Sequence, residues 1–166
     1  VGRSPKKIWW QSEILGADNM IFVTIGMLYG FNRLIKKMDE IALMGEDVVM
    51  QIGESSYLPK NTKYFRYVSK IDMNKYYENA RTNVCHPEVD SIIPGLEYGK
   101  PIIVVPRLKI YGEAVDDHQV EIAKELQKKG KIKVAHNIEE LEILLNSIKE
   151  TDKYNKENKK SDLVLN

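Results

Sequence analysis

Side chains that could bind an anion or a sugar gather between residues 84 and 119. They are His86, Asp117, His118 and Gln119. Imidazole and amide groups can hydrogen-bond phosphate oxygens, and carboxylates can accept hydrogen bonds from sugar hydroxyls. Each also has a simpler use, because a lone histidine usually satisfies a nearby carbonyl and Asp116 with Gln119 matches a helix capping box. Their chemistry therefore depends on whether the fold brings them together.

Small residues follow the first two apolar runs of the sequence. Gly26 and Gly30 frame a turn after the first run, where backbone amides and a helix N-terminus could approach a phosphate. A tight turn explains the same glycines equally well. Ser55 and Ser56 place two hydroxyls after the second run, although loops of this kind are more often simply solvated. Neither GxGxxG nor GxxxxGK[ST] occurs here, which argues against an NAD enzyme and a P-loop.

Metal chemistry and covalent catalysis find little support. The three histidines are far apart and Cys85 is the single cysteine, so we predict no metal site and no disulfide framework. No nucleophile elbow accompanies a Ser, His, Asp order. A formal net charge of +1 predicts no nucleic-acid partner. One cysteine suits a reducing compartment, so a cytoplasmic location is expected.

The elements that must position these residues alternate between strand and helix. Apolar, β-branched runs predict strands at 20–25, 47–52, 63–68, 83–86, 102–105 and 132–134. Helical periodicity or capping signals, such as Ser69 with Asp72, predict helices at 31–44, 69–80, 117–129 and 138–150. Such βαβ units indicate an α/β fold, a Rossmann-like doubly wound parallel sheet. Its strand ends would converge on one edge, where such folds hold ligands.

Three parts of the chain differ in composition. Residues 1–19 lack periodicity and are interpreted as an N-terminal linker or extension. Residues 20–150 carry the alternating pattern and form the predicted domain. Residues 151–166 are a polar C-terminal tail whose composition predicts mobility, because few apolar groups offset the entropy of ordering.

Four segments together resemble a known family. They read TIGMLYGFNRLI, VVMQIGESSY, HPEVDSIIPGLEYGKPIIVVPR and GEAVDDHQ. In this order they are similar to the C-terminal, nucleotide-sugar-binding domain of family 28 glycosyltransferases, over roughly residues 20–145. The small one-domain members are most alike: the catalytic subunit that adds the second GlcNAc to dolichol-linked GlcNAc, and its bacterial exopolysaccharide and capsule counterparts.

The resemblance implies one half of a GT-B glycosyltransferase. This half would hold a UDP-sugar, and a membrane-associated partner subunit or domain would hold a lipid-linked glycan acceptor. The implied reaction is an inverting transfer with no cofactor and no obligatory metal. A cytoplasmic chain of this kind would be recruited to the membrane through its partner.

The resemblance also implies donor-binding positions. By position, Gly26 belongs to the first phosphate-side loop, and Ser55 and Ser56 lie at the cleft. The histidine at 86 and the serine at 91 belong to the diphosphate turn, residues 106 and 107 border the base and sugar pocket, and the glutamine contacts sugar hydroxyls. The positions are Gly26, Ser55, Ser56, His86, Ser91, Pro106, Arg107, Asp117, His118 and Gln119.

The sequence departs from the family pattern at the diphosphate turn. Glu88 and Asp90 replace two expected glycines, and Pro94 replaces a glutamate that holds the ribose. A carboxylate about 4 Å from a phosphate charge would oppose binding by about 4 kcal/mol at an intermediate dielectric. A helix is also predicted after the turn that starts with His86, and Pro94 inside it is expected to kink this helix or end it near residue 93.

Three interpretations remain at this point. In the first the chain is a working donor-binding subunit, with Glu88 or Glu97 replacing the lost ribose contact. In the second it is a degenerate, non-catalytic homologue that keeps the fold and the partner but not the donor. In the third it is a nucleotide-binding regulatory module. No residue is assigned as the catalytic base.

Overall fold

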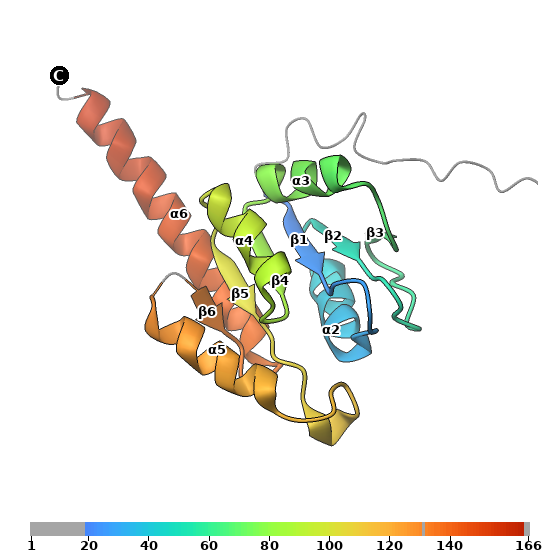
Figure 1. Ribbon diagram of the computed structural model, residues 1–166. Helices are drawn as coiled ribbons and strands as arrows, with labels where there is room; N and C mark the ends of the chain where they lie inside the picture. The colour runs from blue at the N-terminus through green and yellow to red at the C-terminus, as the bar shows by residue number, and fades with distance from the viewer. Residues whose placement is uncertain (1–18, 131, 165–166) are drawn as a thin grey trace, which may run out of the picture.

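The computed structural model describes residues 19–130 and 132–164 and contains a six-stranded parallel sheet (Figure 1). Its strand order is β3-β2-β1-β4-β5-β6, and every neighbouring pair is parallel. The predicted Rossmann-like doubly wound sheet is therefore confirmed. The strands are β1 (Ile21–Thr24), β2 (Val48–Gln51), β3 (Lys63–Phe65), β4 (Thr82–Cys85), β5 (Ile102–Val104) and β6 (Ile132–Val134).

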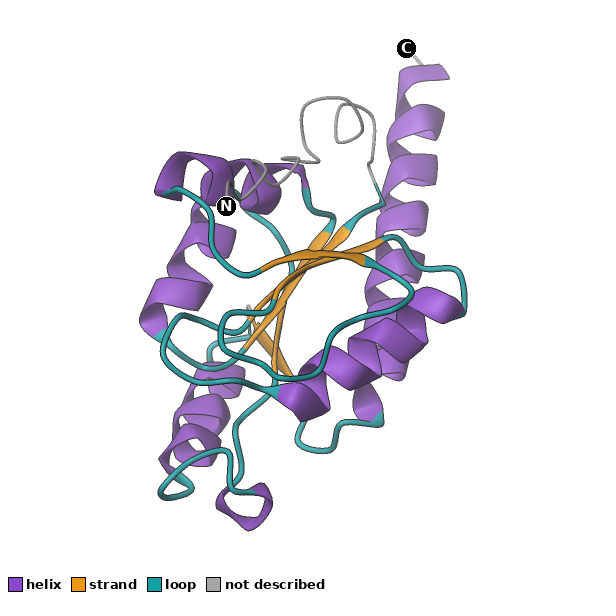
Figure 2. Ribbon diagram, turned by 90° about the vertical axis from the view of Figure 1, so that its right-hand side faces the viewer, coloured by secondary structure: helices purple, strands orange, loops and turns teal. Residues whose placement is uncertain are grey.

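Helices cover both faces of the sheet (Figure 2). Apolar side chains of α2 and α6 pack in one cluster on one face, and those of α3, α4 and α5 pack on the other. A short 3-10 helix, η1, follows β5. The helices are α2 (Asn32–Leu43), α3 (Lys70–Asn79), α4 (Val89–Glu97), η1 (Lys109–Tyr111), α5 (His118–Lys128) and α6 (Glu140–Val164).

The central strand β1 is buried on both faces, as its continuous apolar run predicts. Ile21 and Val23 point into the cluster shared with α2 and α6. Phe22 points the other way, where its ring centroid lies 5.2 Å from those of Tyr76 and Tyr77 on α3. Alternating side chains of one strand therefore hold the two helical layers together.

The order in which strands are added to the sheet reverses between β1 and β4. These strands pair in register from Ile21 with Thr82 to Thr24 with Cys85. From β1 the sheet continues to β2 and β3, and from β4 it continues the other way to β5 and β6. The loops after β1 and β4 diverge at such a point, which opens a crevice at the carboxyl edge of the sheet.

Helix α4 does not end near residue 93, so the early end predicted as one effect of Pro94 was wrong. It continues through Pro94 to Glu97, and Tyr98 N donates to the Pro94 carbonyl at 3.2 Å. Proline removes only its own N–H, and here the carbonyl left without a helical donor belongs to the exposed Asp90. The helix therefore keeps its length and its N-terminus stays at the carboxyl edge of the sheet.

Helix α6 is longer than predicted. It begins at Glu140 and continues to Val164, so residues 151–164, expected to be a mobile tail, are helical. The helix extends beyond the amino edge of the sheet (Figure 1). Within residues 19–130 and 132–164, no helix has the length and apolar character needed to cross a membrane. The predicted N-terminal extension lies outside the described residues, except for Asn19.

Candidate functional site

A cavity of ≈ 420 Å³ lies over the crevice between β1 and β4. The loops after β1, β4 and β5 and the first turn of α5 form its walls. Five predicted donor-binding residues line it, and Asp116, next to the predicted Asp117, lines it too. The polar and glycine residues of the lining include Gly26, His86, Glu88, Arg107, Glu113, Asp116, His118 and Gln119.

Gly26 fits against the ring of His86. Its φ is +77°, and a Cβ added to it would lie 2.9 Å from His86 Cε1. Its carbonyl accepts a hydrogen bond from Gln51 Nε2 at 3.0 Å. Glycine is therefore required at this position for two reasons: the left-handed backbone and the close approach of the His86 imidazole.

His86 is buried at the floor of the cavity, immediately after β4. Its Nε2 lies 2.9 Å from Glu88 Oε2. Burial lowers the pKa of His86, whereas the hydrogen bond and charge of Glu88 act in the opposite direction. With its pKa below the ordinary value, the imidazole is neutral at neutral pH, and its Nε2–H donates to the carboxylate.

Gln119 joins the walls of the cavity instead of capping α5. Its Oε1 accepts from Arg107 N at 2.9 Å, and its Nε2 lies 3.4 Å from Glu88 Oε1. The capping box predicted for Asp116 and Gln119 is therefore wrong. Asp116 Oδ1 accepts from His118 N at 3.0 Å, within the turn that starts the helix.

Arg107 borders the cavity but its guanidinium serves the fold. The side chain is buried, its Nη2 donates to the carbonyls of Ile25 at 2.9 Å and Tyr29 at 3.1 Å, and its Nη1 donates to the carbonyl of Gly30. Burial lowers the pKa of Arg107, and the nearby carboxylates of Glu88 and Glu113 oppose that effect. Arg107 thus fixes the loop after β1 that forms one wall.

No signal in the sequence predicts the ion pair between Arg33 and Glu113. Arg33 Nε and Nη2 lie 2.8 and 2.9 Å from the two carboxylate oxygens, and Nη2 also donates to the Pro106 carbonyl at 3.0 Å. Glu113 Oε2 accepts from Leu108 N at 3.0 Å. These contacts tie the loop after β5 to α2. The partners are 80 residues apart in sequence, so only the tertiary fold pairs them.

The two predicted serines serve the start of α2. Ser55 Oγ accepts from Phe31 N at 2.8 Å, and Ser56 Oγ accepts from Asn32 Nδ2 at 2.7 Å. Neither serine lines the 420 Å³ cavity. Ser55 therefore satisfies the backbone amide of Phe31, the N-cap residue of α2, whereas Ser56 bonds only the side-chain amide of Asn32.

Three other predicted residues lie beside the cavity and do not line it. Pro106 offers its carbonyl to Arg33, and Asp117 Oδ1 accepts from Lys109 N at 3.0 Å. Ser91 lines an adjoining cavity of ≈ 320 Å³, which also contains Asp90. Gly26 and Met27 line both cavities, so the loop after β1 separates them.

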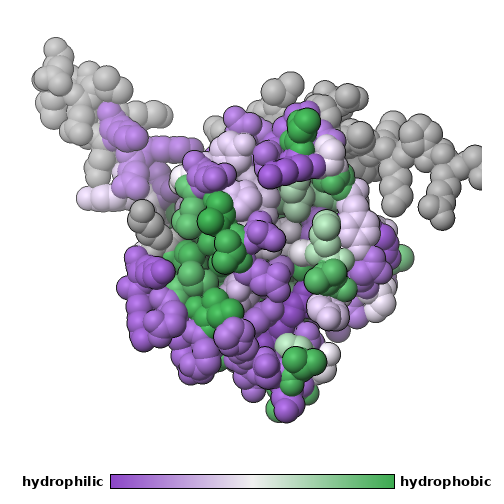
Figure 3. Space-filling view, in the orientation of Figure 1, coloured by the Kyte–Doolittle hydropathy of each residue, from purple (hydrophilic) through white to green (hydrophobic). Residues whose placement is uncertain are grey.

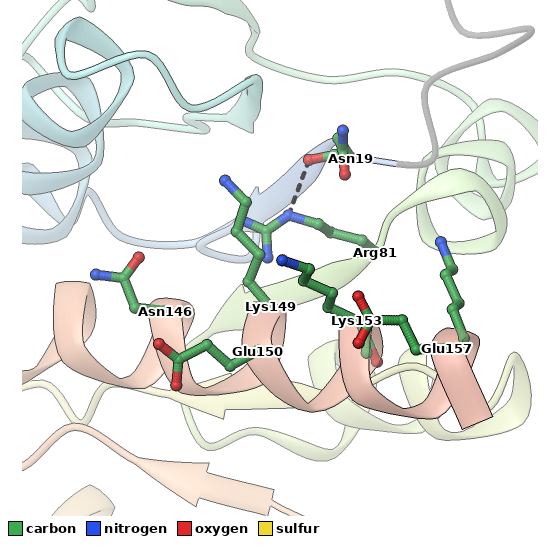
Figure 4. A pocket seen from close by; sticks show the side chains of 9 residues that line it. Asn19, Arg81, Asn146, Lys149, Glu150, Lys153 and Glu157 are labelled. Carbon is green, nitrogen blue, oxygen red and sulfur yellow. Dashed lines mark hydrogen bonds between the residues drawn. The ribbon is translucent and has the colours of Figure 1, made fainter.

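A larger cavity, ≈ 630 Å³, lies at the opposite edge of the sheet, between α6 and the start of β4 (Figure 4). Its charges compensate one another. Arg81 Nη2 and Lys149 Nζ lie 2.8 and 3.1 Å from the two carboxylate oxygens of Glu46, and Arg81 Nε donates to the carbonyl of Asn19. The cavity contains none of the predicted site residues. We therefore place the functional site at the carboxyl edge. Among the described residues, no group of three or more His, Cys, Asp or Glu side chains is placed to hold a metal ion.

A model of the glycosyltransferase family 28 C-terminal domain matches residues 20–164. The chain belongs to glycosyltransferase family 28. The resemblance found in its motifs is thereby confirmed, and the match extends into the predicted tail.

Curated relatives carry the same kind of domain. The UDP-N-acetylglucosamine transferase subunit ALG13 of Candida albicans is 35% identical over 127 residues, which are 70% of this chain and 41% of that protein. The human protein of the same name is 30% identical over 122 residues, 66% of this chain and 10% of that protein. The chain thus spans well under half the length of these relatives.

Solved structures share the fold of this family 28 chain. A glycotransferase of kitacinnamycin superposes with a TM-score of 0.61 at 22% identity, over 89% of this chain and 39% of that one. An NMR structure of ALG13 gives a TM-score of 0.55 at 18% identity, over 78% and 84%. At such identities the likeness shows the fold alone. The domain is one half of a GT-B fold, as predicted.

Proposed function

We propose that this family 28 chain is the donor-binding half of a glycosyltransferase. It holds a UDP-sugar in the 420 Å³ cavity, and an acceptor hydroxyl displaces UDP from the anomeric carbon with inversion. The acceptor is a lipid-linked glycan held by a membrane-associated partner, which also recruits this cytoplasmic chain. The observation that carries the proposal is the convergence on one cavity of Gly26, His86, Arg107, His118 and Gln119.

The N-terminus of α4 supports binding of the diphosphate. This helix starts directly beyond the cavity floor, and the amides of Ser91 and Ile92 are bonded to the Glu88 carbonyl at 3.0 and 3.1 Å. The amides before them, at Val89 and Asp90, precede the helical hydrogen-bond pattern. Such amides and the helix dipole stabilise a leaving diphosphate.

Exposed apolar side chains on two loops beside the cavity support a partner. Leu28 is 80% exposed on the loop after β1, and Val115 is 89% exposed on the loop after β5. Ile110 and Tyr111 add to the second loop, which forms an apolar patch at the foot of Figure 3. Apolar groups gathered around a polar cavity are typical of a surface that another protein covers. The relatives named above are called transferase subunits.

Titration with UDP tests the proposal, by calorimetry or by NMR and with a partner present. We expect saturable binding of UDP and much weaker binding of ADP. No UDP binding at millimolar concentration would favour the degenerate homologue, an alternative that the carboxylate of Glu88 in the cavity motivates. Equal binding of ADP would favour the regulatory module. Repeating the titration with EDTA tests the expectation that no metal is obligatory.

A matched pair of variants on α5 tests the sugar contact. Gln119→Ala is expected to weaken UDP-GlcNAc binding about fivefold and UDP binding less, because a lost hydrogen bond to a sugar hydroxyl is worth about 1 kcal/mol. Gln127→Ala is the control, since Gln127 contacts His136 at 3.0 Å, away from the cavity. Equal weakening of both ligands by Gln119→Ala would contradict the assigned sugar contact.

A further inference from the structure

Glu88 occupies an unusual place at the start of α4. It is the N-cap residue, yet its side chain makes no capping hydrogen bond. Instead the carboxylate turns over the cavity floor, with Oε2 2.9 Å from His86 Nε2 and Oε1 3.4 Å from Gln119 Nε2. Aspartate is a preferred N-cap residue and glutamate is not, and the longer side chain of Glu88 reaches the cavity floor instead of the helix amides.

The carboxylate meets the donor groups that an incoming anion would use. His86 and Gln119 each direct an N–H toward it, and the third donor of the cavity, Arg107, is engaged by the carbonyls of Ile25, Tyr29 and Gly30. A carboxylate oxygen and a phosphate oxygen make the same charge-assisted hydrogen bonds to these donors. Both cannot occupy the position at once.

The charge of Glu88 also has a role toward Arg107. The guanidinium is buried, and Glu88 and Glu113 are the carboxylates that favour its charged form. A phosphate arriving at the cavity would bring a replacement negative charge. Exchange of one anion for another therefore leaves the buried cation compensated, whereas simple addition of a second anion would bring two negative charges together.

We propose that Glu88 is a built-in anion at the diphosphate position, and that a UDP-sugar binds by displacing its carboxylate from His86 and Gln119. This inference rests on the proposed function and makes Glu88 the residue that sets donor affinity. The side chain is 57% exposed, so it can rotate toward solvent without disturbing the core.

Asp90 differs from Glu88, although both replace glycines of the family pattern. It is exposed and lines the adjoining cavity, not the cavity that His86 and Gln119 line. The two carboxylates are therefore not equivalent obstacles. Of the two, only Glu88 contacts the donor groups His86 and Gln119.

Calorimetric titration of the full chain with UDP tests the proposal. Glu88→Ala is expected to bind UDP about tenfold more tightly than the unmodified chain, a change of about 1.4 kcal/mol. Glu88→Gln, which loses the charge and keeps the shape, is expected to fall between the two. Asp90→Asn and Glu78→Gln, which remove the same charge elsewhere, are expected to change affinity less than twofold.

The ¹⁵N signals of the His86 ring provide a readout independent of affinity. Replacing Glu88 by Ala removes the acceptor of the Nε2–H and should shift the Nε2 signal. UDP added to this variant should move the signal back toward its original position, because a phosphate oxygen takes the place of the carboxylate. A merely structural role for Glu88 would leave the signal insensitive to UDP.

The outcomes separate this inference from the proposed function. If the unmodified chain binds UDP and both Glu88 variants bind no more tightly, the inference is wrong and the function stands. If no chain binds UDP, including the variants, both are wrong. If only the Glu88 variants bind, the inference is supported and the unmodified chain is blocked by its own carboxylate. Glu88→Gln keeps the test valid should Glu88→Ala fail to fold.

Discussion

The loop after β2, which crosses from the carboxyl edge of the sheet to the start of β3, and the turn after β4 use polar side chains for different purposes. In the loop, Asp39 of α2 accepts from Lys60 N, Asn61 N and Tyr57 Oη, all between 2.8 and 3.1 Å. In the turn, His86 and Glu88 contact each other and face a cavity. The first arrangement occupies both carboxylate oxygens of Asp39 with donors of the loop, whereas the second places donors beside a cavity.

The difference follows from the hydrogen-bonding needs of the backbone. An irregular loop has amides without partners, and buried side-chain oxygens such as those of Asp39 and Ser55 supply acceptors. A strand that leads almost directly into a helix, as β4 leads into α4, has few such amides. Its side chains remain available for binding, which makes short strand-to-helix turns the better candidates for sites.

The largest effect is expected from Asp39→Ala. It removes the acceptor of three hydrogen bonds around a buried carboxylate and should lower the free energy of unfolding by about 3 kcal/mol. Urea denaturation measures this change. Glu40→Ala, one residue along on the exposed side of α2, is the control and should change stability by less than about 0.5 kcal/mol. UDP binding by folded Asp39→Ala should be unaltered. A large loss of affinity would contradict the assignment of a structural role to Asp39 and a binding role to the turn after β4.

Gly26→Ala should destabilise the chain by about 2 kcal/mol and weaken UDP binding. The backbone φ of +77° is strained for alanine, and the new Cβ would press on the His86 ring. Gly45→Ala separates the two causes, because Gly45 has a φ of +107° with nothing within 4 Å of the added Cβ. It should lower stability by about 1 kcal/mol without affecting UDP. Equal affinities for the two variants would argue against Gly26 as part of the site.

Ser55→Ala tests the serine that the family resemblance placed at the cleft. Loss of the acceptor for Phe31 N should cost about 1 kcal/mol of stability, as for a lost helix cap, and leave UDP affinity unchanged. Ser56→Ala, whose hydroxyl bonds an exposed amide, should cost only about 0.3 kcal/mol. Thermal denaturation and UDP titration of both variants give the answer. A selective loss of affinity in Ser55→Ala would return this serine to the donor site.

The smallest effect is the pH dependence contributed by Asp39. Burial acts to raise the pKa of Asp39, but hydrogen bonds from Lys60, Asn61 and Tyr57 outweigh it and hold the pKa below its ordinary value. The contribution of the Asp39 carboxylate to the free energy of unfolding is therefore complete above the unfolded-state pKa of about 4. It is lost as the pH falls through the lower pKa of the folded state. As the pH is lowered from 6 to 3, the denaturation midpoint should fall less steeply for Asp39→Asn than for the unmodified chain. Parallel curves would contradict this account.

Local signals in the sequence predicted most of the fold correctly. The six strands lie within one or two residues of their predicted bounds at most ends. The agreement is physical for the inner strands β1, β2, β4 and β5, whose residues are all buried in the sheet. Ser69 caps α3, with Oγ accepting from Asp72 N at 3.1 Å, as its spacing predicted. Signals that depended on a single residue were weaker, since Pro94 did not end α4 and Gln119 did not cap α5.

The sequence by itself determined the alternating elements, the doubly wound sheet and the family, and it predicted the edge of the sheet at which we propose the ligand site. Those properties follow from periodicity and from motifs read along the chain. Only the tertiary structure decided which polar residues face the cavity. Ser55 Oγ accepts from Phe31 N, and Arg107 donates to three backbone carbonyls. The carboxylate of Glu88, in contrast, contacts His86 at the cavity. The reason is physical: a buried polar group takes the partner that the fold brings to it, and that partner can lie 80 residues away.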